Sequence, residues 1–387
     1  MYRTLLALLL AVSFLVRPAF AAHPDTQRLS QLPVSIILTE AETGRVLYEE
    51  NADQVRPPAS MIKLMMMLLI AEGIESGLVQ LDTPIPVTEH AQAMGGTQVQ
   101  LKAGEVWPLH DMLRALAVAS ANDAAMAMAL SLWGSEDVYR QAMNKRAAEL
   151  GMEHTKFFSM HGLPPDEGDD FDWTTARDMS LLARECLKHP LIRELVSMKE
   201  LKFRPTDAVK FNTNKLLWRM PGCDGMKTGY IKAAGFCVTA TAERNGVRLI
   251  AVVMGDPSKY SRFNRAQEAM EQAFDSMRKV ALAEPGVPLG APVEVLAAKE
   301  PTIRLTPETA IEAELLPDEQ DRVKYLWNLP ETLAAPIPAG KVVGEVAAVL
   351  DGIVLGRTNL VTPTAVEREG WSLVLRQGVA MWVGLDQ

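Results

Sequence analysis

The chain has 387 residues, and 48% of them are hydrophobic, which is enough for two or three domains with sizeable cores. Its formal net charge at pH 7 is −9 and it contains no basic run, which argues against nucleic acid as a partner. The three cysteines are too few for a disulfide framework, which excludes the small disulfide-dependent scaffolds.

The N-terminus has the pattern of a secretory signal peptide. Arg3 precedes an apolar run over 5–16, and Ala19-Phe-Ala21 supplies the small residues of a cleavage site. The run is too short to span a bilayer as a helix, and no cysteine near the cleavage site indicates a lipoprotein. We therefore expect residues 1–21 to direct export across the cytoplasmic membrane.

The mature chain opens with two strand-like runs, 34–38 and 45–49, which we expect to pair as a hairpin. Helical runs then dominate from 60 to 150. Ser60 follows two prolines and precedes good helix formers, so a helix that begins near Ser60 places Lys63 one turn later on the same face.

Ser60 and Lys63 are a candidate nucleophile and the candidate base that would deprotonate it. Serine alone is a weak nucleophile at neutral pH, and a lysine kept neutral by burial or by a neighbouring cation can accept its proton. The alternative is an N-cap serine followed by a solvated lysine. Ser276 and Lys279 repeat the same spacing, and we interpret that second pair as the end of a surface helix.

A second motif, Ser120-Ala-Asn122, lies between two apolar helical runs, 109–118 and 124–132. A serine and an asparagine two residues apart in a short connection can point into one cleft. The alternative, which this motif taken alone favours, is that Asn122 and Asp123 cap the second helix.

A third motif, Lys227-Thr-Gly229, precedes a strand-like run over 236–241. At a strand edge, Lys227 and Thr228 can bind a carboxylate, and Gly229 lets a substrate backbone lie close and pair as an extra strand. Lys227 is also a candidate for the positive charge that keeps Lys63 neutral. The alternative is a surface hairpin with an exposed lysine.

The remaining elements divide the chain by composition. We expect a helix over 174–187, a strand over 248–254 and a helix from about 261 to 280, followed by short alternating strands to about 363. The predicted organisation is a signal peptide at 1–21, a catalytic domain at 22–284, a β-rich domain at 285–367 and an amphipathic helix at 368–387.

The predicted C-terminal helix has one apolar face that includes two tryptophans. Such a helix suits the membrane interface, although Arg376 is the only cation between residues 371 and 385. A helix packed on the β-rich domain is the alternative. The residues on the apolar face are Trp371, Val374, Leu375, Gly378, Met381, Trp382 and Leu385.

Cys223 and Cys237 flank the third motif and are candidates for neighbours in space. We interpret them, together with Cys186, as small buried apolar residues with at least one free thiol. No pair of histidines, cysteines or carboxylates shows zinc-site spacing, and no glycine-rich loop precedes a helix. We therefore expect neither a metal nor a cofactor.

The three motifs occur in one order and together supply the groups of an acyl-transfer enzyme that uses lysine as its base. With these motifs the chain resembles a low-molecular-mass penicillin-binding protein, specifically a serine-type D-alanyl-D-alanine carboxypeptidase. Two features depart from the family pattern: Ala121 stands where glycine is more common, and 166–172 is acidic. The segments that carry the resemblance are 57–63, 119–124, 174–179, 224–230, 234–237 and 252–255.

The resemblance implies an α+β fold, in which a five-stranded antiparallel sheet has helices on both sides and a small all-β domain follows. It also implies a substrate, a peptidoglycan stem peptide that ends in D-Ala-D-Ala. Ser60 would attack the penultimate D-alanine carbonyl while Lys63 takes its proton. Backbone N–H groups of Ser60 and Tyr230 would hold the oxyanion.

By the same resemblance, Ser120 and Lys227 would pass a proton to the leaving D-alanine, and Asn122 would orient the peptide amide. Thr228 and Arg262 would bind the terminal carboxylate; a surface arginine is the alternative for Arg262. β-Lactams would imitate the substrate and trap Ser60. The family also implies a periplasmic enzyme held at the outer face of the cytoplasmic membrane by its C-terminal helix.

Two other functions remain open at this stage. A β-lactamase shares all three motifs, but the Glu-x-x-x-Asn loop that commonly serves its deacylation is absent, because Phe171 follows Glu167 at the matching place. A non-catalytic protein that binds the cell wall or senses penicillin would need a broken catalytic set, whereas the residues of all three motifs are intact.

Overall fold

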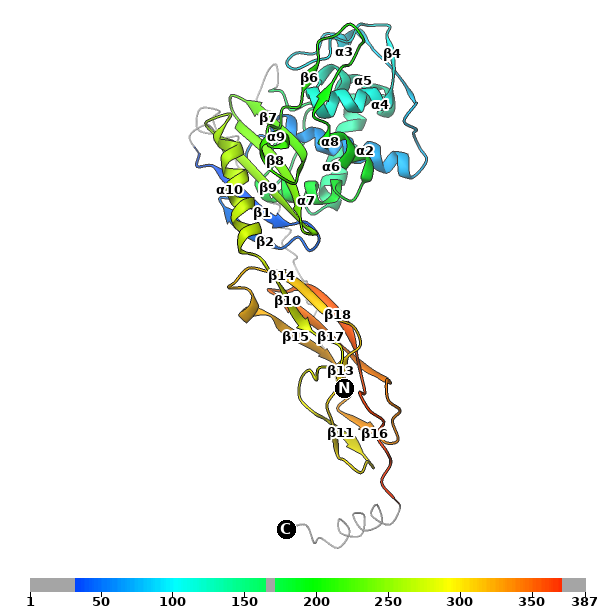
Figure 1. The fold of residues 1–387 in the computed structure, drawn as a ribbon. Helices are drawn as coiled ribbons and strands as arrows, with labels where there is room; N and C mark the ends of the chain where they lie inside the picture. Colours follow the sequence, from blue (N-terminus) through cyan, green and yellow to red (C-terminus); the bar gives the residue numbers. More distant parts are fainter. Residues whose placement is uncertain (1–31, 165–170, 371–387) are drawn as a thin grey trace, which may run out of the picture.

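The computed structural model describes residues 32–164 and 171–370 (Figure 1). The predicted signal peptide, most of the acidic stretch and the predicted C-terminal helix lie outside these residues. Within them, no helix is both long enough and apolar enough to cross a membrane.

A five-stranded antiparallel sheet forms the centre of the N-terminal part. Its strand order is β2-β1-β9-β8-β7, so β7 lies at one edge. The strands are β1 (Ser35–Glu40), β2 (Val46–Glu50), β7 (Cys223–Ile231), β8 (Gly235–Arg244) and β9 (Val247–Asp256). The predicted opening hairpin and the two strands expected after the third motif are confirmed, and β8 and β9 are buried throughout their middle because both faces of the sheet are covered.

Helices cover both faces of this sheet, as Figure 1 shows. Helix α10 (Ser261–Ser276) packs on one face with Phe263 and Met270 in a shared core. The opposite face carries the larger helical part, whose core includes nearly all of α2. Its helices are α2 (Lys63–Glu75), α3 (Glu89–Gln92), α4 (Leu109–Arg114), α5 (Asn122–Trp133), α6 (Glu136–Glu149), α7 (Ala176–Cys186) and α8 (Pro190–Ser197). The short helix α9 (Leu216–Arg219) instead packs on the α10 side, where Leu216 belongs to the core shared with α10 and Arg219 donates hydrogen bonds to two α10 side chains.

Two of the predicted helical stretches were wrong in part. The region 60–150 is interrupted by a two-stranded ribbon of β3 (Pro84–Pro86) and β4 (Val106–Pro108), because prolines there cannot continue a helix. The helix expected to reach residue 280 ends at Ser276. The next residues form β10 (Arg278–Ala283), which pairs with β14 (Ile311–Leu315) and buries its last two side chains.

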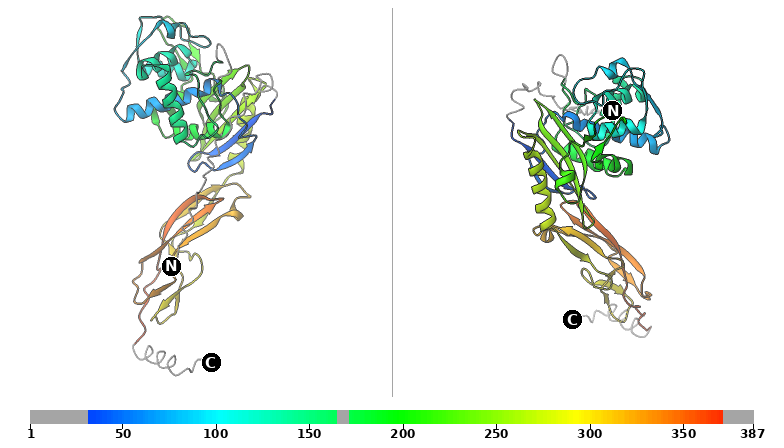
Figure 2. Two further views of the ribbon diagram at one scale, coloured as in Figure 1. Left: turned by 180° about the vertical axis from the view of Figure 1, so that it is seen from behind. Right: turned by 45° about the horizontal axis from the view of Figure 1, so that its top comes forward.

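The C-terminal part is built of short strands with two cores of its own. It extends away from the sheet so that the molecule is elongated, as Figures 1 and 2 show. The exact domain boundaries stay a prediction. The remaining elements of the C-terminal part are β11 (Val293–Leu296), β12 (Thr302–Ile303), β13 (Thr306–Pro307), the 3₁₀-helix η3 (Gln320–Arg322), β15 (Lys324–Asn328), β16 (Thr332–Ala334), β17 (Val342–Leu350) and β18 (Ile353–Val361). The N-terminal part also contains a small ribbon of β5 (Glu200–Leu201) and β6 (Lys210–Phe211).

One buried ion pair joins the two parts of the molecule. The Arg45 guanidinium contacts the Glu319 carboxylate, and both side chains are almost fully buried. The same guanidinium donates to the backbone carbonyl of Glu314 at 2.7 Å. A charge-assisted contact of this kind fixes the angle between the parts as well as contributing energy.

Candidate active site

Ser60 lies in η1 (Ala59–Ile62), one turn of 3₁₀-helix that leads directly into α2. The predicted helix therefore begins in the tighter 3₁₀ form, after Ala59 adopts a left-handed φ of 48°. Its neighbours Met61 and Ile62 are fully buried and hold the turn in place. The Lys63 Nζ lies 2.9 Å from the Ser60 Oγ, so both groups share one face.

Two glycines let the backbone pack closely around this turn. A Cβ on Gly229 would lie 2.5 Å from the Pro58 carbonyl oxygen, and one on Gly162 would lie 2.1 Å from the Ala59 carbonyl oxygen. No real side chain tolerates such distances. The turn that carries Ser60 is therefore packed between strand β7 and the backbone at Gly162. Gly229 is needed for this packing, in addition to the role in substrate approach expected from the sequence.

Ser120 brings the second motif to the same point. It ends η2 (Ala115–Ala119), one turn of π-helix, and has a left-handed φ of 57°. Lys63 Nζ lies 2.8 Å from the Ser120 carbonyl oxygen and 3.2 Å from its Oγ. Strained backbone of this kind gathers at functional sites.

Asn122 is not the helix cap that its motif favours. The N-cap of α5 is Ala121, and the Asn122 Oδ1 instead accepts a hydrogen bond from Lys63 at 2.5 Å. Its amide nitrogen donates to the Gly95 carbonyl at 2.7 Å. Asp123 serves the helix only in part: its buried carboxylate accepts the Ala124 N–H in the first turn of α5, and it also accepts the backbone N–H groups of residues 99 and 101, which ties that loop to α5.

The third motif lies on β7, at the edge of the sheet, and its lysine is buried. Lys227 is 1% exposed, which excludes the exposed hairpin, and its Nζ lies 2.9 Å from the Ser120 Oγ. The Thr228 hydroxyl donates to the Thr213 hydroxyl at 2.7 Å. On its outer side β7 has no strand neighbour among the described residues.

The last two predicted site residues differ in exposure. Tyr230 is 54% exposed, and its ring stacks on Phe236 with centroids 4.2 Å apart. Arg262 is buried at the start of α10, which excludes a surface arginine. Its Nη1 donates to the backbone carbonyls of Gly229 and Cys237 at 3.1 and 2.9 Å.

Burial and like charge shift the pKa of both lysines in the direction that base catalysis needs. Burial, followed by the charge of Lys227, holds the pKa of Lys63 well below its usual value. Burial, followed by the charge of Arg262, lowers the pKa of Lys227 to about 7. Both shifts favour the neutral form of each lysine over the charged form.

Comparison with known proteins agrees with this geometry. A family model described as D-alanyl-D-alanine carboxypeptidase matches residues 23–258, and one for the C-terminal domain of penicillin-binding protein 5 matches residues 279–368. The chain belongs to the D-alanyl-D-alanine carboxypeptidase family. It is a serine hydrolase of the low-molecular-mass penicillin-binding type, and the α+β fold expected from the resemblance is confirmed.

Relatives and solved structures match along most of this carboxypeptidase. The D-alanyl-D-alanine carboxypeptidase DacF of Bacillus subtilis is 34% identical, with 99% of each chain covered. DacC of Escherichia coli is 30% identical over 97% of this chain and 95% of its own. Penicillin-binding protein 5 of Haemophilus influenzae is 26% identical in structure comparison, with a TM-score of 0.66 over 86% of this chain and 97% of that one.

His161 lies beside Ser60 in this carboxypeptidase, although none of the three sequence motifs includes it. The Ser60 hydroxyl lies 3.4 Å from the backbone carbonyl oxygen of His161. Burial, followed by the charge of Lys63, lowers the pKa of the His161 imidazole to about 4, and its Nδ1 accepts the Leu163 N–H at 3.1 Å. The ring is thus neutral at pH 7, its Nδ1 is already engaged, and Lys63 is the titratable group whose side chain contacts the Ser60 hydroxyl.

Asp172, the last residue of the acidic stretch 166–172, holds the loop that precedes His161. The fully buried Asp172 carboxylate accepts the backbone N–H groups of Phe158 and Ser159 at 2.7 and 2.9 Å, and the Ser159 hydroxyl at 2.6 Å. Burial raises its pKa to about 6. Asp172 therefore positions the loop that carries His161 and Gly162 past the serine.

All three cysteines of the carboxypeptidase are free. Cys237 pairs with Gly229 in the sheet, whereas Cys223 pairs with Ala242 at the other end of β7. Burial raises the pKa of the Cys237 thiol to about 11, which keeps it protonated and unreactive.

Proposed function

We propose that Ser60 is the nucleophile of this carboxypeptidase and that its substrate is a peptidoglycan stem pentapeptide ending in D-Ala-D-Ala. The observation that carries the proposal is the contact between Lys63 Nζ and Ser60 Oγ at 2.9 Å, with the lysine fully buried. A neutral lysine at that distance is a general base for a hydroxyl nucleophile.

In the acylation step, Lys63 takes the Ser60 proton as Ser60 attacks the carbonyl carbon of the penultimate D-alanine. Backbone N–H groups of Ser60 and Tyr230 donate to the oxyanion. The close approach of Gly229 to the serine turn supports this assignment, because it brings the next residue of β7 beside the Ser60 backbone nitrogen.

The leaving D-alanine then needs a proton. Ser120 Oγ lies within 3.2 Å of Lys63 Nζ and 2.9 Å of Lys227 Nζ, so its hydroxyl can relay the proton from Lys63 to the departing amine. The positive charge of Lys227 polarises the Ser120 hydroxyl, which carries the proton between Lys63 and the amine. The acyl-enzyme is released by water.

The substrate peptide lies along the free edge of β7 as an added strand, which satisfies backbone groups that have no other strand partner among the described residues. Thr228 and Lys227 bind the terminal carboxylate, and Arg262 adds a second positive charge from behind the strand. Asn122 holds Lys63 through its carbonyl and orients the peptide amide.

β-Lactams acylate the same serine and act as inhibitors. The β-lactamase alternative receives less support, because Phe171 stands where that class commonly has its loop asparagine and is buried beside Trp173. A tryptic digest of the protein after reaction with benzylpenicillin tests the proposal. The adduct is expected on the peptide that contains Ser60; an adduct on another peptide would contradict it.

We also propose that the mature protein is periplasmic and that its C-terminal helix rests on the outer face of the cytoplasmic membrane. The support is the sequence pattern of an export signal at 1–21 and of an apolar face with two tryptophans at 371–385. The elongated C-terminal part then acts as a spacer that holds the active site away from the lipid.

A further inference from the structure

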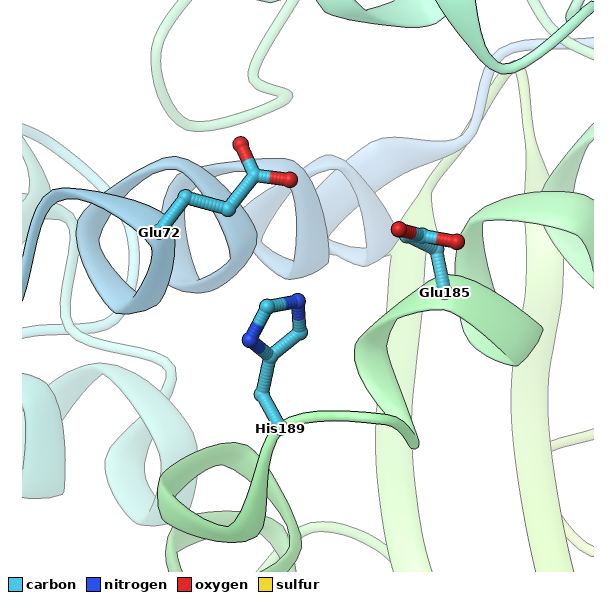
Figure 3. Close-up of side chains that lie close together, drawn as sticks. All are labelled: Glu72, Glu185 and His189. Carbon is cyan, nitrogen blue, oxygen red and sulfur yellow. The ribbon is translucent and has the colours of Figure 1, made fainter. Parts of the chain in front are cut away.

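A second cluster of titratable side chains lies away from the active site, where three helical elements meet. Figure 3 shows Glu72 of α2, Glu185 of α7 and His189, which precedes α8. One ligand atom from each of the three side chains lies within 4.8 Å of the others. Glu72 is separated from the other two by most of the helical part, so sequence spacing gave no expectation of this cluster.

His189 is oriented like a metal ligand. It is more than nine-tenths buried, and its Nδ1 lies 2.7 Å from a carboxylate oxygen of Glu75. Since a carboxylate only accepts, Nδ1 carries a proton, and in the neutral imidazole the lone pair is then on Nε2. A carboxylate that fixes the far nitrogen in this way is the usual support of a metal-binding histidine.

The Nε2 atom itself is buried and has no hydrogen-bond partner among the described residues. Figure 3 shows a ring nitrogen on the imidazole edge that faces the carboxylates of Glu72 and Glu185. A lone pair that faces carboxylate oxygens is unfavourable unless a cation or a proton lies between them.

The ion pairs around the cluster do not use every carboxylate oxygen of Glu72 and Glu185. Arg146 of α6 contacts one oxygen each of Glu72 and Glu185 at 2.7 and 3.1 Å, and Lys188 contacts the second oxygen of Glu185 at 2.6 Å. The second oxygen of Glu72 accepts no hydrogen bond from the described residues.

The cluster has an excess of negative charge. Its four carboxylates face three cations, which gives a net charge of −1 when the histidine is counted as neutral. Lys188 is 61% exposed and can swing away without a large loss. The carboxylates are Glu72, Glu75, Glu149 and Glu185, and the cations are Lys145, Arg146 and Lys188.

We propose that Glu72, Glu185 and His189 bind one Zn²⁺ ion. One imidazole nitrogen and two carboxylate oxygens suit zinc, whereas Ca²⁺ and Mg²⁺ prefer oxygen ligands alone, and water completes the coordination. The ion joins α2, which begins with Lys63, to α7 and α8. Its role is structural, and it reverses the expectation from sequence that the chain holds no metal.

Zinc binding by the full mature chain tests the proposal through two matched variants. His189→Gln removes the nitrogen ligand, while His90→Gln removes an exposed histidine that lies 3.4 Å from Glu136 in a similar His–Glu pair. We expect equilibrium dialysis to show one more bound Zn²⁺ per chain for the wild type and His90→Gln than for His189→Gln. Equal zinc uptake by all three proteins would overturn the proposal.

Thermal unfolding and a cobalt spectrum give readouts that do not depend on activity. Zinc at a hundredfold excess over its Kd is expected to raise the Tm of the wild type by about 5 °C and that of His189→Gln not at all. Co²⁺ is expected to give d–d absorption bands that His189→Gln abolishes.

Glu185→Gln serves as a second variant if His189→Gln fails to bind a fluorescent penicillin and is therefore misfolded. It is expected to lose the same zinc equivalent and the same cobalt bands. A wild type whose Tm and cobalt spectrum do not respond to metal would show that a proton alone occupies the cluster, and the proposal would be wrong.

Discussion

Lys63 and Lys227 are both buried, and their side-chain nitrogens meet at the hydroxyl of Ser120, at 3.2 and 2.9 Å. Two charged ammonium groups this close, in a site that excludes water, repel each other strongly. Burial and the neighbouring charge of Lys227 hold the pKa of Lys63 well below its usual value, which is the shift that the proposed base needs. This shift explains how a lysine can serve as a base at neutral pH.

The first prediction concerns the base itself. Lys63→Arg keeps a positive charge, but a guanidinium cannot be deprotonated usefully and so cannot accept the serine proton. We expect the rate of acylation by benzylpenicillin to fall by at least about 10²-fold, with little change in substrate affinity. Stopped-flow acylation kinetics measure this, and near-normal acylation would show that Lys63 acts through its charge alone.

The second prediction concerns pH. The pKa of Lys227 is about 7, so its charge is present below that pH and is lost as the pH rises through it. We expect kcat/KM for a D-Ala-D-Ala peptide to fall on the alkaline side of about 7, mainly through KM. On the acid side, protonation of Lys63 removes the base, so kcat falls there.

The charge of Arg262 is one cause of the low pKa of Lys227, after burial. Removing that charge should therefore shift the pH at which kcat/KM falls on the alkaline side. Arg262→Gln is expected to move this alkaline limb of the pH profile to higher pH. Arg265→Gln is the control, because Arg265 is half-exposed and pairs with Asp256. An alkaline limb that stays in place in Arg262→Gln would contradict the assignment to Lys227.

The third prediction concerns Gly229. A methyl group there would lie 2.5 Å from the Pro58 carbonyl oxygen and 3.1 Å from the Ala59 side chain, so the serine turn must shift. We expect Gly229→Ala to reduce acylation by about 10²-fold, since a displacement near 1 Å is enough for such a loss. Gly370→Ala, whose added Cβ meets nothing within 4 Å, is expected to match the wild type in the same assay.

The fourth prediction concerns the C-terminus. Deletion of residues 369–387 removes the proposed interfacial helix and leaves the described active site untouched. We expect the truncated protein to move from the membrane pellet to the soluble periplasmic fraction with its peptidase activity intact. Fractionation of cells that express each form decides this, and a full-length protein already soluble at moderate salt would refute the anchor.

Features that depend on residues close together in the sequence could be predicted from it, whereas features that depend on contacts between distant residues could not. The shared face of Ser60 and Lys63 follows from residues three apart in a helical turn. The end of α10 at Ser276 does not, because β10 forms only through pairing with β14 more than thirty residues later.

The active site shows the same division. The three motifs identified its reactive groups, but nothing local indicates that Ser120 adopts a left-handed backbone or that the His161 carbonyl approaches Ser60. Asp123 was interpreted as a helix cap because its sequence position suits one. Its carboxylate does accept the Ala124 N–H of the helix, but its other partners are backbone N–H groups of a loop more than twenty residues earlier, which no local pattern indicates.

Hydrolysis of a stem pentapeptide, followed by mass spectrometry, tests the central claim most directly. The wild type is expected to release one D-alanine per peptide, and Ser276→Ala is expected to do the same, because Ser276 lies at the end of α10 away from the three motifs. Ser60→Ala is expected to release none and to lose labelling by a fluorescent penicillin. D-alanine release or labelling that survives in a folded Ser60→Ala protein would contradict the assignment of Ser60 as the nucleophile.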